Sequence, residues 1–366
     1  MINKRRLIDS FKKMVRIDSL SLKEAKIIHY LQKELKGLGI RSFQAGKPKN
    51  GEIGSLIADV LGKGQRMILN AHVDTVAPGT NIKPIEKNGI IRSNGSTVLG
   101  ADDKTGVAVI LEVLRVLKEN KLAHPPLRVI FTVAEEIGIV GAKALPKSLL
   151  KAQFGITLDS GDNHTIINQA PSQINITATV HGRAAHAGIH PEHGINAIKI
   201  AAAAINKIKL GRIDKETTAN IGVIKGGKAT NIIPEEVMLK GEVRSHDLKK
   251  LKRHIKHMQD VLKKECRKAG ARLKVKLEKM YPAYRIKENS HVFHLAAKAI
   301  KKAGKKPKAK RTGGGSDANI FNAAGVPTVN LGVGMHHVHT TKEIARITYI
   351  VKGAEILLNL IREARA

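Results

Sequence analysis

The stretch Met67-Ile68-Leu69-Asn70-Ala71-His72-Val73-Asp74 decides the fold. Its first half is a short apolar run, which predicts a buried strand. Its second half carries His72 and Asp74 two residues apart, so both side chains leave an extended segment on the same side. A buried strand with a histidine and a carboxylate at its end predicts an open α/β sheet whose site lies at the strand ends.

The segments around this stretch alternate between helical and strand patterns. Residues 4–38 have helical periodicity, and Ser21 followed by Glu24 has the spacing of a capping box for the second of two helices. The pattern continues as a helix at 107–117 and strands at 127–133 and 154–158. This alternation predicts an α/β domain with a mostly parallel central sheet flanked by helices.

The pattern changes at about residue 174, where apolar and polar residues alternate with period two, as in a strand with one solvated face. The predicted elements are strands at 174–180, 218–224, 235–243 and 272–277 and helices at 197–208 and 248–268. The order βαββαβ is that of a ferredoxin-like α+β domain. We therefore expect residues 174–282 to form an inserted domain, with residues 1–173 and 283–366 forming the larger one.

Composition excludes several classes of protein. The chain has 366 residues, of which 42% are hydrophobic, so it can bury a sizeable core. No apolar run approaches the roughly 20 residues that span a membrane, and no apolar region follows the basic N-terminus as in a secretory signal. The single cysteine, Cys266, leaves no intrachain disulfide. We expect a cytoplasmic protein with no membrane partner.

The net charge of +33, from 64 Lys+Arg against 31 Asp+Glu, raises the question of a nucleic-acid partner. The lysines are spread along nearly every segment. The densest run, residues 298–311 (KAIKKAGKKPKAKR), has no aromatic side chain on which a base could stack. We expect a basic surface that adheres to polyanions at low salt, and no specific nucleic-acid partner.

Two pairs of neighbouring carboxylates stand beside predicted elements. Asp102 and Asp103 precede a helix, where a carboxylate serves either as an N-cap or as a bridge between two cations. Glu135 and Glu136 end an apolar strand, where two adjacent carboxylates repel each other and are costly to desolvate. A nearby cation removes that cost, and one glutamate can then bind metal while the other acts as a base.

Two further segments complete the set. Asp159 follows another predicted strand, and the tract at 334–340 contains His336, His337 and His339, whose composition indicates a metal without showing which histidine binds. Histidines and carboxylates without cysteine favour a hydrolytic zinc-type site over a structural one. Shared carboxylates favour two metals about 3.5–4 Å apart that activate one water.

As a set, these motifs resemble the M20 metallopeptidase family, and most closely its peptidase T-like (tripeptide aminopeptidase) branch. The resemblance covers nearly the whole chain, and it implies a catalytic α/β domain with an inserted lid. The resembling stretches are NAHVDTVAPG, LGADDKTGVA, FTVAEEIGIVGAK, TLDSG, GRAAHAGIHPEHGINAI, ATNIIPEEV, GEVRS, GGGSDANIF and GMHHVHTTKE, in family order from residue 70 to 343.

The resemblance implies a ligand set for two divalent ions. His72 and Asp159 bind one ion, His339 and Glu136 bind the other, and Asp102 bridges the two. The ions implied are zinc, with cobalt and manganese as alternatives, because imidazole and carboxylate ligands suit all three.

The resemblance also implies roles beyond metal binding. Asp74 orients His72, and Glu135 is the general base that takes a proton from the bridging water and passes it to the leaving amine. His186 stabilises the tetrahedral oxyanion, in several relatives from the other subunit, which implies a homodimer formed through the lid. Substrate-binding roles fall on Arg244, Asn231, Gly314 and Ser316.

Three functions are compatible with these residues. The first is an aminopeptidase acting on short peptides such as tripeptides, which the peptidase T-like flanks favour. The second is a deacylase or carboxypeptidase on N-acyl amino acids, in which Arg244 holds the amino acid's carboxylate. The third, a non-enzymatic module that binds polyanions, rests on the charge alone.

Overall fold

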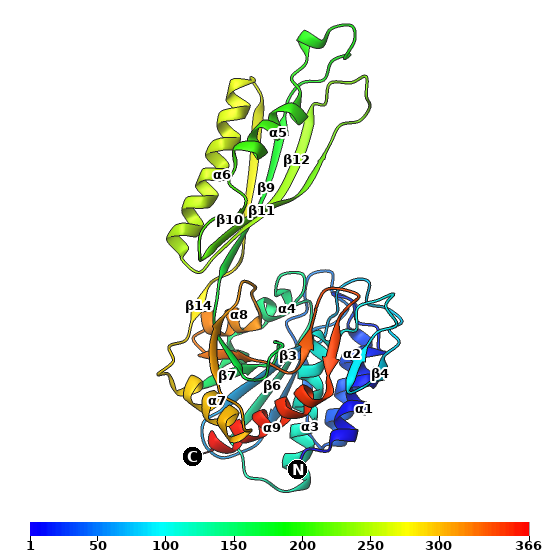
Figure 1. The fold of residues 1–366 in the computed structure, drawn as a ribbon, viewed down its shortest axis with the longest axis vertical. Helices are drawn as coiled ribbons and strands as arrows, with labels where there is room; N and C mark the ends of the chain where they lie inside the picture. The colour runs from blue at the N-terminus through cyan, green and yellow to red at the C-terminus, as the bar shows by residue number, and fades with distance from the viewer. Residues whose placement is uncertain (366) are drawn as a thin grey trace. The chain divides into compact units, whose positions relative to one another are not determined.

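The computed structural model describes residues 1–365, and these divide into two compact units (Figure 1). The first unit consists of Met1–Gln169, Arg285–Thr312 and the segment from Ser316 onward. The second unit consists of Ala170–Tyr284 together with Gly313–Gly315. The glycine-rich segment, which the sequence places in the larger domain, thus groups with the second unit. Each unit has its own hydrophobic core.

The first unit is built on a nine-stranded sheet in which β1-β2-β6-β3-β7-β16-β8-β14 are neighbours and β15 pairs with β8. The inner strands β6, β3, β7 and β16 are parallel, whereas β2 pairs with β6 and β8 pairs with β16 in antiparallel fashion, and β1 is antiparallel to β2. The predicted α/β class is confirmed. The strands are β1 (Ser42–Ala45), β2 (Ser55–Val60), β3 (Met67–His72), β6 (Leu127–Thr132), β7 (Phe154–Thr157), β8 (Thr165–Ala170), β14 (Tyr284–Arg285), β15 (Lys308–Arg311) and β16 (Thr328–Leu331).

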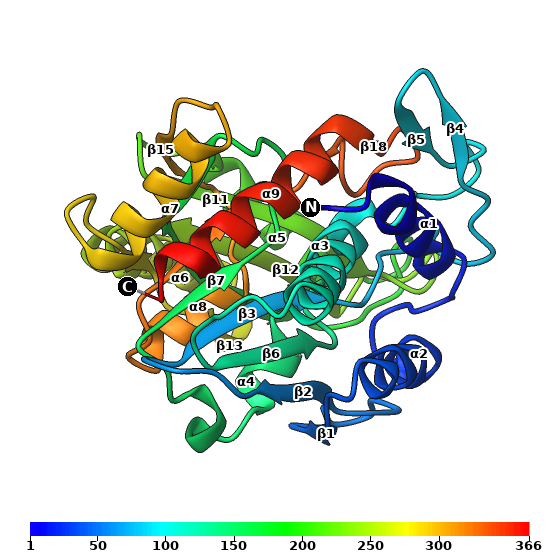
Figure 2. The same cartoon turned by 90° about the horizontal axis from the view of Figure 1, so that it is seen from below.

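Helices cover both faces of this sheet, because its inner strands are apolar on both sides. In β3, Met67 and Leu69 pack into one core and Ile68 into the other. The larger core lies under α1 (Lys4–Val15), α2 (Ala25–Gly37), α3 (Ala101–Glu119), α7 (His291–Lys302) and α9 (Ile347–Glu363) (Figure 2). The smaller core lies under α4 (Val140–Ala144), the 3₁₀ turn Lys147–Leu150 and α8 (Asp317–Ala323).

The predicted capping box at Ser21 is wrong. Helix α2 begins at Ala25 with Glu24 in the N-cap position and no side-chain cap. The Glu24 carboxylate is fully buried and accepts hydrogen bonds from the backbone N–H groups of Leu22 and Ala134, at 2.8 and 2.9 Å. Both side chains bind segments far along the chain instead. Glu24 accepts from Ala134, and Ser21 donates to the Asp74 carboxylate of the candidate site described below.

The second unit is a five-stranded antiparallel sheet in the order β10-β11-β12-β9-β13, with two helices packed on one face (Figure 1). Its four long strands and two helices follow the predicted order βαββαβ, which confirms the ferredoxin-like arrangement. The short β10 (Gly211–Arg212) is an addition. The other elements are β9 (Ser172–His181), α5 (Ala197–Lys207), β11 (Thr217–Gly226), β12 (Glu236–Ser245), α6 (Leu248–Lys268) and β13 (Arg272–Tyr281).

A small four-stranded sheet, which the sequence patterns do not predict, belongs to the first unit. Its order is β17-β18-β5-β4, from β4 (Ile85–Lys87), β5 (Ile90–Arg92), β17 (Met335–His336) and β18 (Ile344–Arg346). These strands are only two or three residues long, too short for a periodicity to be recognised. None of the helices formed by residues 1–365 combines the length and the apolar character that crossing a bilayer requires.

The burial of the core predicts that replacing two different phenylalanines will change the free energy of unfolding by very different amounts. Phe131 in β6 is fully buried, whereas Phe43 in β1 is 46% exposed. Phe131→Ala should lower the free energy of unfolding by about 3–5 kcal/mol, because it removes buried apolar surface and leaves a cavity. Phe43→Ala should cost less than about 1 kcal/mol. Urea unfolding followed by circular dichroism tests this, and equal losses for the two variants would contradict the assignment of the core.

Candidate metal centre

The acidic and imidazole groups converge because three parallel strands end at one edge of the sheet. Strand β3 lies between β6 and β7, with His72 opposite Thr132 and Asn70 opposite Thr157. The chain beyond each strand therefore leaves the sheet at the same level. Glu135 follows β6 by three residues, and Asp159 follows β7 by two.

One group of possible metal ligands consists of His72, Asp102 and Asp159, whose donor atoms all lie within 4.8 Å of one another. The Nε2 atom of His72 is 3.0 Å from Oδ1 of Asp102. Asp102 belongs to the first turn of α3, where it and Asp103 depart from helical geometry and are joined by a cis peptide bond. Asn330 holds the backbone of Asp159 by two hydrogen bonds, of 2.9 and 2.8 Å.

A second group consists of Asp102, Glu136 and His339, again with donor atoms within 4.8 Å of one another. The Nε2 atom of His339 is 3.0 Å from the Glu136 carboxylate and 3.4 Å from Oδ2 of Asp102. Asp102 is thus common to both groups, and its two oxygens face different histidines. This is the arrangement that a carboxylate bridging two cations requires.

Asp74 lies behind His72 and connects the strand ends. Its Oδ1 is 3.3 Å from Nδ1 of His72, on the side of the ring away from Asp102. The same carboxylate accepts hydrogen bonds from the backbone N–H groups of Glu135 (3.0 Å) and Glu136 (3.1 Å) and from the hydroxyl of Ser21 (2.7 Å). These contacts fix the imidazole ring and the chain that carries both glutamates.

The electrostatics of the centre favour a bound cation. Burial raises the pKa of Glu135 and of Asp159 well above the ordinary values, and neighbouring negative charges add to the effect. Asp103 is affected in the same way, through burial and the charge of Asp159. Packing several buried carboxylates together is unfavourable unless positive charge compensates them. The donor set, two imidazoles and three carboxylates without cysteine, fits two zinc-type ions.

The two histidines interact with carboxylates at the positions where metal bonds would form. Burial by itself lowers the pKa of His72, but hydrogen bonds to Asp102 and Asp74 outweigh it and raise the pKa well above the usual value. Hydrogen bonds to Asp102 and Glu136 raise the pKa of His339 to about 10. Each ring thus directs Nε2 into the centre, and in the neutral form that atom offers its lone pair to a cation.

Sequence reasoning missed Glu343, which holds the loop in front of Asp102. Its carboxylate is 1% exposed and accepts hydrogen bonds from the backbone N–H groups of Leu99 (2.7 Å), Gly100 (2.8 Å) and Asp102 (2.9 Å). Glu343 thereby anchors the backbone just before the regular part of α3, whose first turn is capped by the Asp103 carboxylate accepting from the Gly106 N–H at 3.2 Å. Its position at the end of the histidine-rich motif was the only available signal.

A second missed feature is a buried polar network beneath the centre. The Asn70 side chain donates to Oδ2 of Asp317 at 3.0 Å and accepts from the Thr157 hydroxyl at 3.0 Å. Thr132 donates to the same Asp317 oxygen. The network joins β3, β6, β7 and the start of α8, so it links the strands from which the candidate ligands emerge.

The remaining predicted residues are distributed over both units. In the second unit, His186 and Asn231 are exposed and lie on neighbouring segments, where the Ala187 N–H donates to the Asn231 carbonyl at 2.9 Å. Arg244 makes a two-point contact with Glu242, at 2.8 and 3.1 Å, and Gly314 belongs to the segment that joins this unit. In the first unit, Ser316 is 5% exposed and is the N-cap of α8.

The position of Glu343 leads to a prediction about metal affinity. Glu343→Ala should weaken zinc binding by about 10- to 100-fold, because the backbone that presents Asp102 loses its three acceptor contacts. Glu355→Ala, which removes a partly exposed carboxylate paired with Lys352, is the matched control and should leave zinc binding unchanged. Competition with a chromogenic chelator measures both. Unchanged zinc affinity in Glu343→Ala would show that Glu343 does not position Asp102.

Comparisons with known proteins agree with this geometry. The family model described as Peptidase family M20/M25/M40 matches residues 68–363. A tripeptidase from Staphylococcus aureus subsp. aureus mu50 is 40% identical, with 100% of this chain and 99% of that chain covered and a TM-score of 0.95. The aminopeptidase PepT from Bacillus cereus ATCC 10987 is 39% identical, with both chains fully covered and a TM-score of 0.89.

A curated relative is similar over nearly the same span. Peptidase T of Exiguobacterium sp. strain AT1b is 25% identical over 381 residues, covering 93% of this chain and 91% of its own. The family model covers most of the chain, and the two solved structures match its whole length. The chain therefore belongs to peptidase family M20/M25/M40 and is a peptidase of the peptidase T-like branch.

Proposed function

We propose that the protein is a di-zinc aminopeptidase that releases the N-terminal residue of short peptides, tripeptides above all. The observation that carries the proposal is the Asp102 carboxylate, whose two oxygens face His72 and His339 within two overlapping ligand groups. The substrate class is supported by similar chains that are named as a tripeptidase and as the aminopeptidase PepT.

Each residue has a distinct role in this proposal. His72 and Asp159 would hold one ion, Glu136 and His339 would hold the other, and Asp102 would contribute to both sites. The ions, when bound, would supply a water of lowered pKa and would polarise the scissile carbonyl. Asp74 keeps the His72 ring oriented through its Nδ1 side.

Glu135 is the general base of the proposal. It is 8% exposed, and its backbone N–H is fixed by Asp74, so its carboxylate stands beside the ligands on a restrained segment. It takes a proton from the attacking water and delivers it to the amine that leaves. Burial favours the protonated state that the carboxyl group must reach before it gives the proton away.

The alternative, hydrolysis of N-acyl amino acids, uses the same centre and differs in what holds the substrate. It gives Arg244 the task of binding a carboxylate, yet Nε and Nη2 of that guanidinium donate to Glu242, and Nη1 donates to the Gly313 carbonyl. A substrate carboxylate would have to share or displace this contact. The structure therefore gives the deacylase no specific support.

One experiment tests the proposal. The protein is freed of metal with a chelator, reloaded with zinc, and assayed on a tripeptide and on the same tripeptide with an acetylated N-terminus. We expect zinc-dependent release of the N-terminal residue from the free peptide and much slower hydrolysis of the acetylated one. Glu135→Gln should reduce kcat by at least about 100-fold, because the general base is lost.

The controls separate the possible failures. Glu288→Gln, a change of the same kind at an exposed residue, should leave the rate unchanged. Hydrolysis that survives Glu135→Gln would refute the mechanism. Faster hydrolysis of the acetylated peptide would favour the deacylase, and hydrolysis that persists without any divalent metal would refute the di-metal proposal.

We further propose that the second unit is a lid and dimerisation domain, that His186 acts on the site of the other subunit, and that the enzyme works in the cytoplasm. The lid role is supported by the exposure of His186 and Asn231 on neighbouring segments. The cytoplasmic location rests on the absence of cysteines that could pair, since the lone Cys266 is buried.

The role of His186 across subunits predicts complementation. His186→Ala and Glu135→Gln chains should each be nearly inactive alone. Their co-expression should restore activity, because the mixed dimer contains one site with an intact base and an intact histidine from the partner. Sedimentation of the wild-type chain supplies the matching measurement of dimer formation. A mixture as inactive as its components, or a fully active monomer, would contradict the proposal.

A further inference from the structure

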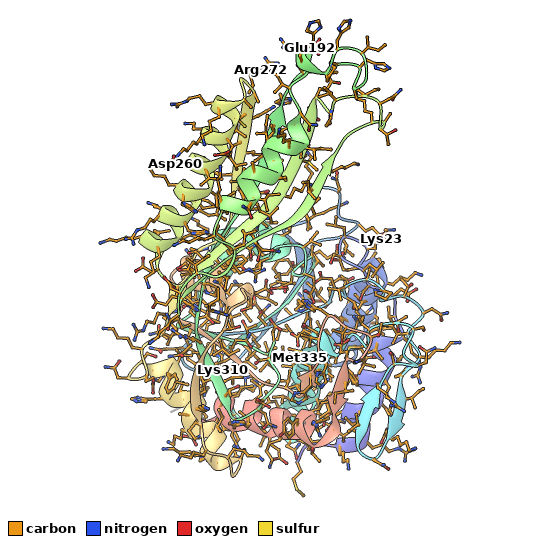
Figure 3. All side chains as sticks on the ribbon, turned by 45° about the horizontal axis from the view of Figure 1, so that its top comes forward. Lys23, Glu192, Asp260, Arg272, Lys310 and Met335 are labelled. Atoms are coloured by element: carbon orange, nitrogen blue, oxygen red, sulfur yellow. The ribbon has the colours of Figure 1, made fainter. Side chains whose placement is uncertain are left out.

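A second cluster of side chains that could hold a metal ion lies on the loop between β9 and α5 in the second unit. A backbone bridge between Arg183 and Ile195 closes the loop, with hydrogen bonds of 3.0 and 2.9 Å. At its far end the chain forms a 3₁₀ turn, Pro191–His193. Figure 3 shows Glu192 at the tip of this unit, with its side chain on the outside of the fold.

The 3₁₀ turn brings two imidazole rings together. In 3₁₀ geometry, side chains three residues apart eclipse each other. His190 and His193 have this spacing, and the His193 N–H donates to the His190 carbonyl at 3.2 Å. Their ring centroids are 5.0 Å apart, and the ring planes are inclined by only 17°. Pro191 restricts the backbone between them, so the pairing is set by the local chain.

A carboxylate lies beside both rings. The Oε1 atom of Glu192 is 3.3 Å from Nδ1 of His190 and 3.8 Å from Nε2 of His193. The donor atoms of the three residues all lie within 4.8 Å of one another. These three side chains thus combine two imidazoles with one carboxylate.

We propose that His190, Glu192 and His193 bind a divalent transition-metal ion, separately from the residues of the metal centre. Two imidazoles and one carboxylate select zinc, nickel or copper over magnesium or calcium, which prefer oxygen ligands. Three protein ligands leave a coordination position for water. The side chains are exposed, so an ion reaches them directly from solvent.

An ion bound here would also affect the loop that carries His186. The His190 N–H donates to the His186 carbonyl at 3.2 Å, so the two histidine segments are joined through the backbone. Joining residue 190 to residue 193 through a metal removes conformational freedom from the turn. Amide hydrogen exchange in residues 186–194 therefore becomes slower when the ion binds.

The test counts zinc ions per chain by equilibrium dialysis and elemental analysis. It compares the wild type, the double variant His190→Ala/His193→Ala, and a control, His29→Ala/His294→Ala, which removes two exposed histidines elsewhere. The wild type and the control should each hold about one zinc ion more per chain than the double variant. Glu192→Gln should bind this ion more weakly, because the negative charge is lost.

Hydrogen exchange supplies a readout that does not depend on the ion count. Zinc should slow exchange in residues 186–194 of the wild type and of the control, with no effect in the double variant. Equal zinc counts in all three proteins, or an ion lost from the control as well, would overturn the proposal. Because neither readout uses peptide hydrolysis, the outcome is independent of the function proposed for the metal centre.

Discussion

The contact on which the centre depends is the Asp102 carboxylate held between two imidazoles, 3.0 Å from His72 and 3.4 Å from His339. Asp102 cannot be placed there by α3 alone, because the helix begins at that point and its first N–H groups lack intrahelical partners. Glu343 accepts the Asp102 N–H from a segment more than 240 residues away in sequence. Two buried carboxylates therefore connect distant parts of the sequence. Glu343 holds the backbone of Asp102, and the Asp102 carboxylate faces both histidines.

The cost of this arrangement is a concentration of buried acids, which shapes the surrounding scaffold. Asp74, Asp103 and Asp317 are each almost completely buried. All three are anchored by donors from other elements, Asp74 by two backbone N–H groups, Asp103 by the backbone N–H of His72, and Asp317 by Asn70 and Thr132. Parallel strands that are buried on both faces can hold these buried carboxylates in place, because the hydrogen bonds between the strands leave the strand ends little freedom to move. Sites that conflict with the preferences of a core are typically functional.

The sequence predicts the parts of the fold that local periodicity encodes. The apolar run of β3 and the period-two alternation of β9 identify strands, and the helix at Leu248–Lys268 has the predicted bounds. The role of Glu343, and the use of Ser21 by Asp74 instead of by α2, were not predictable in this way. They depend on contacts between segments far apart in the chain. The spacing of Ser21 and Glu24 is that of a capping box even though Ser21 binds Asp74 in the folded protein. The convergence of His72, Asp102 and Asp159 was predictable because the strand ends of a parallel sheet meet at one edge.

The centre explains hydrolysis of an amide and leaves the choice of substrate to groups outside it, since a peptide and an N-acyl amino acid present the same carbonyl to the same ligands. Substrate class must then depend on what binds the rest of the molecule. Arg244 would be an obvious partner for a free carboxylate, but its paired donors already meet Glu242, and a competing carboxylate must match that two-point contact. The carboxylate of an N-acyl amino acid would thus have to compete with the Glu242 side chain for Arg244. The C-terminal carboxylate of a short peptide meets the same competition, so the better support for the aminopeptidase comes from the similar chains that are named as a tripeptidase and as the aminopeptidase PepT.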